Sequence, residues 1–195
     1  MNEKIPDKKI EVINFGVSSA TAESEYSLIK NKISLLDPDL IIMYDGWNER
    51  DIPVEKSIRS WESACKLGIN EGFDIIIIVQ PIPTTGHRVL TEQEIANSFL
   101  NLPYLQKFPQ YVNAFEELDK VCSKTVDFRR IFDYVQEPIF YDYGHTGPLG
   151  NQIIAENVFS VISPIYFGKT YSVIHNNLNS DNNEPETVVV YAVGA

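Results

Sequence analysis

The sequence predicts an α/β protein in which helices cover a mostly parallel β-sheet. Two continuous apolar runs, at 40–44 and 73–80, are typical of parallel strands that are buried on both faces. Segments with the helical spacing of apolar residues, at 22–36 and 54–70, precede these runs with short connections. Alternation of this kind forms right-handed βαβ units, so we expect an α/β sandwich within one domain of 195 residues.

The first half of the chain contains the regular elements. They are expected to be a strand at 11–15, a helix at 22–36, a strand at 40–44, a helix at 54–70 and a strand at 73–80. The first strand ends in a turn at Gly16, and Asp37-Pro38-Asp39 stops the first helix. The strand at 40–44 leads into a polar turn that contains Trp47 and Asn48, and Trp47 and Trp61 are expected in the core.

The second half begins with an irregular insert. Residues 81–109 are rich in Pro, Gly and polar residues, and their length predicts a lid or substrate-binding loop. Inside this insert, Thr91 and Glu94 match a capping box at the start of a helix. The remaining expected elements are a helix at 110–123, a short edge strand at 126–128, a helix at 149–165, a polar linker at 168–187 and a strand-like tail at 188–195. The main domain is therefore expected to span 1–167.

Composition and charge narrow the function classes. The net charge of −11 argues against nucleic acid as a partner, because phosphate binding needs clustered Lys and Arg. Cys65 and Cys122 have no metal-ligand spacing, so we expect two reduced cysteines and predict neither a metal nor a cofactor. The first ten residues lack the apolar core of a signal peptide, and no apolar run is long enough to span a membrane. A soluble cytoplasmic protein without a membrane partner is the expectation.

The loop from Tyr141 to Asn151 carries the strongest chemical signal. Asp142 and His145 lie three residues apart in it, so that a carboxylate can orient an imidazole that acts as a base. Gly16 and Asn48 follow two of the predicted strands, and parallel strands bring their carboxyl ends to one edge. A backbone N–H at Gly16 and the Asn48 amide would supply hydrogen-bond donors to an oxyanion, as ester hydrolysis requires.

These motifs resemble those of the SGNH (GDSL-like) hydrolase family. Asn14-Phe15-Gly16-Val17-Ser18 is similar to the second family block, and Tyr44-Asp45-Gly46-Trp47-Asn48-Glu49 is similar to the third, with Glu49 in place of Asp. Asp142-x-x-His145 with Gly150-Asn151 is similar to the fifth. The resemblance implies a flavodoxin-like three-layer α/β/α sandwich and an esterase or deacylase that acts on a small-molecule acyl ester or an acylated carbohydrate. It also implies that His145 is the base, Asp142 its partner, and Gly16 and Asn48 the oxyanion donors.

The sequence departs from this family at the nucleophile. The family's Ser lies in a Gly-Asp-Ser-like turn upstream of the Gly16 block, and no Gly-Asp-Ser occurs in the chain. Ser18 and Ser19 are expected to cap the following helix. The leading hypothesis is therefore an SGNH-type Ser-His-Asp hydrolase whose Ser is missing here through truncation or an altered gene start. A catalytically inactive relative that binds an acylated small molecule or carbohydrate is the alternative. A metal-binding or structural α/β domain is the third.

The tail at 188–195 offers a solution to the missing first strand of the resembled fold. That strand lies between those that correspond to 11–15 and 40–44, and a gap there would leave buried backbone groups unpaired. The tail is β-branched and ends in Gly194-Ala195, where a Ser would come next in the family. We therefore predict that the tail fills the central position, as in a circular permutation.

Overall fold

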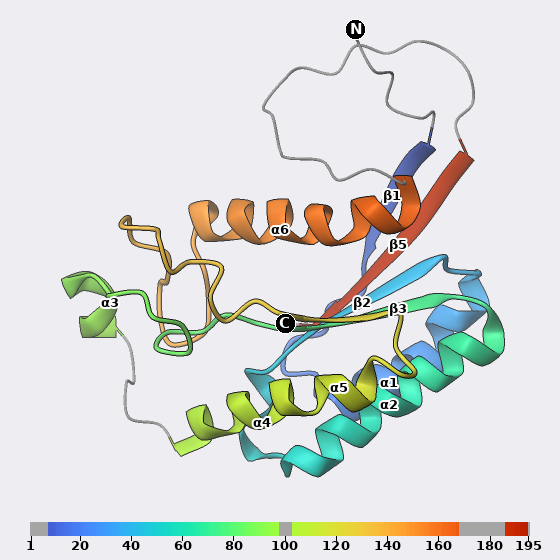
Figure 1. Cartoon of the computed structure of the whole chain (residues 1–195), viewed down its shortest axis with the longest axis horizontal. Helices are drawn as coiled ribbons and strands as arrows, with labels where there is room; N and C mark the ends of the chain where they lie inside the picture. The colour runs from blue at the N-terminus through green and yellow to red at the C-terminus, as the bar shows by residue number, and fades with distance from the viewer. Residues whose placement is uncertain (1–7, 98–102, 168–185, 195) are drawn as a thin grey trace, which may run out of the picture.

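The computed structural model describes residues 8–97, 103–167 and 186–194, which contain a five-stranded, fully parallel sheet (Figure 1). The strands are β1 (Lys8–Asn14), β2 (Leu40–Asp45), β3 (Asp74–Val79), β4 (Lys124–Asp127) and β5 (Glu186–Gly194). Their order across the sheet is β1-β5-β2-β3-β4. This is the flavodoxin-like order 2-1-3-4-5 with β5 in the position of the first strand.

Helices cover both faces of the sheet, which gives the predicted three-layer α/β/α sandwich (Figure 1). The α-helices are α1 (Ala22–Leu28), α2 (Val54–Glu71), α3 (Glu92–Asn97), α4 (Phe108–Asn113), α5 (Phe115–Leu118) and α6 (Pro148–Phe167). The shorter helical turns are η1 (Ile29–Ile33), η2 (Ser34–Leu36), η3 (Asn48–Asp51) and η4 (Pro103–Lys107). In Figure 1, α6 lies on one face, and α1, α2, α4 and α5 lie on the other.

The prediction for the tail is confirmed, because β5 lies between β1 and β2. Val190 is aligned with Val12 on one side and with Leu40 on the other. Both neighbours run parallel to β5, so its backbone N–H and C=O groups are paired along both edges. An interior strand of the sheet, paired on both edges, is thus formed by the last described segment of the chain.

Alternate residues of β2 enter two separate cores. Ile41 and Met43 pack into the core beneath α1 and α2, whereas Leu40 and Ile42 pack against α6. All four side chains are buried. Each contributes about 1.5–3 kcal/mol of hydrophobic transfer free energy, so a strand that is apolar on both faces is stable only between two helical layers. This arrangement confirms the interpretation of the apolar runs as central strands.

The first helix differs from its prediction, because the segment 22–36 is not one regular α-helix. It is α-helical to Leu28, widens to a π-helix at Ile29–Ile33 and ends as a 3₁₀ turn. The side chain of Asn31 donates to the Ser27 carbonyl at 2.7 Å and competes with backbone N–H groups for that acceptor. The apolar spacing alone does not report this competition.

The expectation of two reduced cysteines is wrong, because Cys65 and Cys122 form a disulfide bond. Cys65 lies on α2 and Cys122 follows α5, and the two helices pack on the same face of the sheet (Figure 1). The cysteines are 57 residues apart, and their proximity depends on this tertiary packing rather than on local spacing. Disulfides are rare in the cytosol, so this bond argues against the cytoplasmic location that the sequence predicts.

Candidate functional site

Asp142 and His145 form the pair that their spacing predicts. The Nδ1 atom of His145 lies 2.9 Å from Oδ2 of Asp142 and 3.1 Å from Oδ1. A proton on Nδ1 satisfies this contact and leaves Nε2 as the basic nitrogen. The His145 side chain is 67 % exposed, so Nε2 is on a surface that a ligand can reach.

The Asp142 carboxylate also shapes the loop. Its Oδ1 atom accepts hydrogen bonds from the backbone N–H groups of Gly144 at 2.8 Å and His145 at 2.9 Å. Partial burial alone would raise the pKa of Asp142, but the N–H groups of His145 and Gly144, together with the His145 ring, hold this pKa below its usual value. Asp142 is therefore an anion that fixes both the backbone and the imidazole of the loop.

Short-range backbone pairing closes this loop at its base. Phe140 and Thr146 form an antiparallel bridge, and the Tyr141 N–H donates to the His145 carbonyl at 2.9 Å. Gly150 lies against Thr146, where an added Cβ would come within 2.8 Å of the Thr146 Cβ. This contact excludes a larger side chain in the first turn of α6. Close packing against Thr146 thus explains why position 150 is a glycine.

The turn that carries Asn48 packs directly against the Asp142/His145 loop. The ring of Trp47 stacks on Tyr143 with centroids 4.7 Å apart, and an added Cβ on Gly144 would be 3.0 Å from the same indole. The backbone N–H of Trp47 donates to the buried side chain of Gln80 at 3.0 Å. The contact between Trp47 and Tyr143 therefore brings the motif that contains Asn48 and the Asp142/His145 motif together.

Gly16 lies at the same edge of the sheet. Asn14 ends β1 in register with Ala192 of β5, and Tyr44 pairs with Gly194. The carboxyl ends of β1, β5 and β2 consequently lie at one edge of the sheet. The Gly16 N–H donates to the Asn14 side chain at 2.7 Å, so an incoming oxyanion would have to replace this acceptor.

Ser18 and Ser19 belong to a separate hollow. Ser19 adopts a left-handed backbone conformation with φ of 63°, and both serines line a cavity of about 330 Å³ between Phe15 and α1. Among the described residues that line it, none comes from the Asp142/His145 loop. Neither serine caps α1 as predicted, because the N-cap of that helix is Thr21.

Glu94 anchors the segment that leads into the Asp142/His145 loop, and sequence patterns did not assign it to the candidate site. The predicted capping box is confirmed, because Thr91 N–H donates to Glu94 Oε2 at 2.8 Å and Glu94 N–H donates to Thr91 Oγ1 at 3.3 Å. The other oxygen, Oε1, accepts from the N–H groups of Ile139 at 2.8 Å and Phe140 at 3.0 Å. These two residues lead into the loop that contains Asp142, so α3 holds the base of that loop.

Arg88 completes this anchor. Its Nη1 donates to Glu94 Oε1 at 2.9 Å, and its Nε donates to the Val135 carbonyl at 2.8 Å. Burial would raise the pKa of Glu94, but the bonds from Arg88 and from three backbone N–H groups lower it to about 2. The first part of the insert is thus fixed to the segment that precedes the site. Its role toward a substrate stays a prediction.

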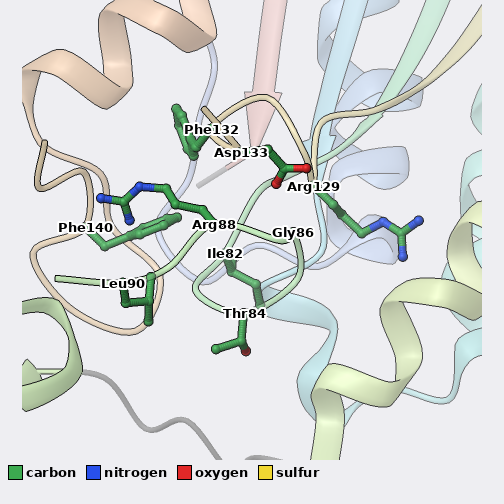
Figure 2. A pocket seen from close by; sticks show the side chains of 9 residues that line it. All are labelled: Ile82, Thr84, Gly86, Arg88, Leu90, Arg129, Phe132, Asp133 and Phe140. Carbon is green, nitrogen blue, oxygen red and sulfur yellow. The ribbon is translucent and has the colours of Figure 1, made fainter. Parts of the chain in front are cut away.

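Figure 2 shows a small hollow between these two segments, with Arg88 and Arg129 among its lining residues. Its volume is about 10 Å³, which is room for about one water molecule. The guanidinium of Arg129 points away from the hollow in Figure 2 and binds both carboxylate oxygens of Asp127. Both arginines are therefore committed to structural contacts, and the hollow is too small for a substrate.

Three carboxyl groups are buried beneath the Asn48 turn. Asp45 accepts from Trp61 Nε1 at 2.6 Å, and Glu49 accepts from the Ala22 N–H at 2.7 Å. Burial and the charges of Asp45 and Glu49 raise the pKa of Glu25 to about 11, whereas burial and Glu49 raise that of Asp45 to about 7. Glu25 is therefore a neutral acid at pH 7, and the neighbouring Asp45 carboxyl group contributes to keeping it protonated.

Two further properties of the described residues bear on metal binding and on membrane insertion. Within the described ranges, no group of three or more His, Cys, Asp or Glu side chains is arranged to hold a metal ion. No described helix is both long and apolar enough to cross a membrane.

The fold is similar to that of two solved esterases. An acetyl xylan esterase, AlAXEase, superposes with a TM-score of 0.57 over 78 % of this chain and 81 % of that chain, at 13 % sequence identity. A variant of an acetyl-xylooligosaccharide esterase from Geobacillus Stearmophilus superposes with a TM-score of 0.56 over 74 % of this chain and 68 % of that chain, at 16 % identity. No protein-family model matches the sequence, and no curated protein matches it. The similarity at these identities shows the fold alone.

Proposed function

We propose that the chain provides the base and the oxyanion site of an SGNH-type hydrolase that cleaves acyl esters. The observation that carries this proposal is the Asp142–His145 pair, packed through Tyr143 against the Trp47-Asn48 turn at the carboxyl edge of the sheet. In open parallel sheets this edge is where ligands bind. The two esterases of similar fold support the reaction class, and their acetylated carbohydrate substrates suggest the substrate class.

Each residue has a role that follows from its chemistry. His145 Nε2 takes the proton from a serine hydroxyl as that oxygen attacks the ester carbonyl, and later gives it to the leaving alcohol. Asp142 holds the imidazole through Nδ1 and stabilises its charged form. The Gly16 N–H and the Asn48 amide donate to the oxyanion that forms on the carbonyl oxygen.

The serine of this mechanism belongs at the end of β5. No Gly-Asp-Ser occurs in the sequence, and Gly194 lies beside Tyr44 at the end of the central strand. In the resembled family the nucleophile follows the strand at this position. A serine placed after Ala195 would therefore be on the same edge as His145.

The test is a gain of activity. We expect the 195-residue chain to hydrolyse p-nitrophenyl acetate and acetylated xylo-oligosaccharides at background rate, because loss of a nucleophile costs orders of magnitude. A variant extended after Ala195 by Ser and a short Gly-rich tail should exceed the background by about 100-fold or more. The matched control carries Ala in place of the added Ser, and His145→Ala in the extended chain should abolish the gain.

Two results would contradict this proposal. If the extended chain were no faster than its Ala control, the site would not be a serine hydrolase site. If the original chain already turned over and His145→Ala abolished that turnover, the nucleophile would lie elsewhere, and Ser18 and Ser19 would be the residues to replace.

A non-catalytic binding domain is the second candidate, and the absence of a Gly-Asp-Ser sequence favours it. In that case the pocket beside His145 would hold an acylated small molecule or carbohydrate without cleaving it. Titration calorimetry with acetylated xylo-oligosaccharides would show binding that His145→Ala weakens, while the Ser-extended chain stays inactive.

A further inference from the structure

Glu49 connects the two loops that carry the proposed oxyanion donors. It follows Asn48 in the chain and is fully buried. Its Oε1 atom accepts from the N–H of Ala22 at 2.7 Å, and its Oε2 atom accepts from the Ser57 hydroxyl. Ala22 begins α1 directly after the loop that contains Gly16. One side chain therefore ties the Asn48 turn to the end of the Gly16 loop and to α2.

Burial makes this link difficult to replace. Ala22 and Ser57 are almost fully buried, so water cannot compensate their donors if the carboxylate is lost. The Ala22 N–H is one of the first helical donors, which have no partner inside their own helix. A carboxylate at this position also interacts favourably with the positive end of the helix dipole.

The Gly16 loop makes hydrogen bonds that are local to it, and one of them is the bond from the Gly16 N–H to the Asn14 side chain at 2.7 Å. Residues 16–19 are exposed, and the loop is closed by one backbone bond from Ala20 N–H to the Val17 carbonyl at 3.0 Å. The Asn48 turn, in contrast, is also held from its outer side. Lys107 Nζ donates to the carbonyls of Arg50 and Ile52, at 2.6 Å in both cases. Glu49 thus connects a fixed turn to a loop that depends on it.

We propose that Glu49 is a positioning residue that sets the spacing between the Gly16 N–H and the Asn48 amide. This inference rests on the proposed function. The carboxylate does not contact the substrate in this scheme. It acts on the oxyanion site through Ala22 on one side and through its own backbone neighbour on the other.

The kinetic test uses the Ser-extended chain. We expect Glu49→Ala to lower kcat by about 100-fold, because small displacements of catalytic groups cost that much, with little change in KM. Glu49→Gln should stay within about tenfold of the parent, because an amide can accept from Ala22 and donate to Ser57. Trp61→Phe is the matched control, since it removes the buried bond to Asp45 but leaves the link to Ala22.

The outcomes separate positioning from mere stability. Loss of kcat in Glu49→Ala at a temperature where it is folded, with rescue by Gln and little loss in Trp61→Phe, would support the proposal. If Glu49→Ala kept the parent kcat, or if Trp61→Phe lost as much, Glu49 would have only a structural role.

A second measurement does not depend on activity. In the original chain, we expect Glu49→Ala to speed amide hydrogen exchange at Ala22 by about tenfold or more and to shift the Gly16 amide resonance, with both effects reversed in Glu49→Gln. Unchanged Gly16 and Ala22 signals would overturn the proposal. An inactive Ser-extended chain with these changes present would instead refute the proposed function and leave the link between the loops intact.

Discussion

At the scale of single residues, buried carboxyl groups organise the loops of the candidate site. Glu94 holds the backbone that leads to Asp142, and Glu49 joins the Asn48 turn to α1, whereas Asp45 accepts a hydrogen bond from Trp61 in the core. Each of these three carboxyl groups accepts hydrogen bonds. By contrast, both carboxyl oxygens of Glu25 are buried without a hydrogen-bond partner among the described residues. Glu25 and Asp45 therefore bind a proton more tightly in the folded state than in the unfolded state, which makes the stability of the protein depend on pH.

We predict that the protein is more stable at pH 5 than at pH 8. The folded-state pKa values of Asp45 and Glu25, about 7 and about 11, lie above the ordinary values of 3.8 and 4.5. Both groups therefore contribute stability that is fully present below pH 4 and is lost as the pH rises toward their folded-state values. At pH 8 the free energy of unfolding of Glu25→Gln should exceed that of the wild type by at least about 1.4 kcal/mol, the equivalent of one pKa unit.

Denaturant unfolding at several pH values checks this prediction. Glu23→Gln is the matched control, because Glu23 is on the same helix but pairs with Lys56 at the surface. Equal pH slopes in the wild type and in Glu25→Gln would show that Glu25 does not contribute to the pH dependence of stability.

The sequence predicts contacts between near neighbours better than contacts between distant ones. Asp142 and His145 are three residues apart, so their hydrogen bond follows from local loop geometry. Thr91 and Glu94 are equally close, and their capping box is confirmed. The bond from Ala22 to Glu49 spans 27 residues and depends on how α1 and β2 pack, so no local pattern reports it.

At the scale of the elements, the disulfide joins α2 to the segment before β4. We predict that Cys65→Ala with Cys122→Ala lowers the free energy of unfolding by about 4 kcal/mol, because a crosslink over 57 residues restricts the unfolded chain. Thermal unfolding of the oxidised protein, the reduced protein and the double variant would measure this effect. Two free thiols in the native protein, or an unchanged melting temperature after reduction, would contradict it.

The helices were predicted more completely than their irregularities. Apolar spacing located α2 at Val54–Glu71 and α6 at Pro148–Phe167 to within one or two residues. The segment predicted as one helix at 110–123 is instead α4 and α5, which are separated at Ala114. Competition from the Asn31 side chain interrupts the first helix without changing its apolar spacing, so periodicity cannot reveal it.

At the scale of the whole molecule, the sheet depends on β5 as the strand that joins β1 to β2. We predict that Val190→Pro abolishes cooperative unfolding, because proline removes a donor from a strand that is paired on both edges. Val190→Ile keeps a β-branched residue and should unfold like the wild type. Circular dichroism during heating distinguishes the two variants, and a cooperative transition in Val190→Pro would show that β5 is dispensable.

The order of the strands was predictable because of a general requirement rather than a local motif. Buried N–H and C=O groups need partners, and a gap between β1 and β2 would have left two rows of them unpaired. The tail was a β-branched segment of the right length. The disulfide had no comparable requirement, since the two cysteines could have been buried as thiols.

The central position of β5 has a consequence for biosynthesis. The ribosome makes β1 and β2 first, and the strand that separates them emerges only after α6. Until then, the nascent chain exposes two facing strand edges, which are templates for pairing with other chains. Contacts between β1 and β5 join residues at opposite ends of the described sequence, and contacts of such long range form slowly. The sheet therefore closes only after β5 has been made, and chaperones that shield strand edges would act before that point.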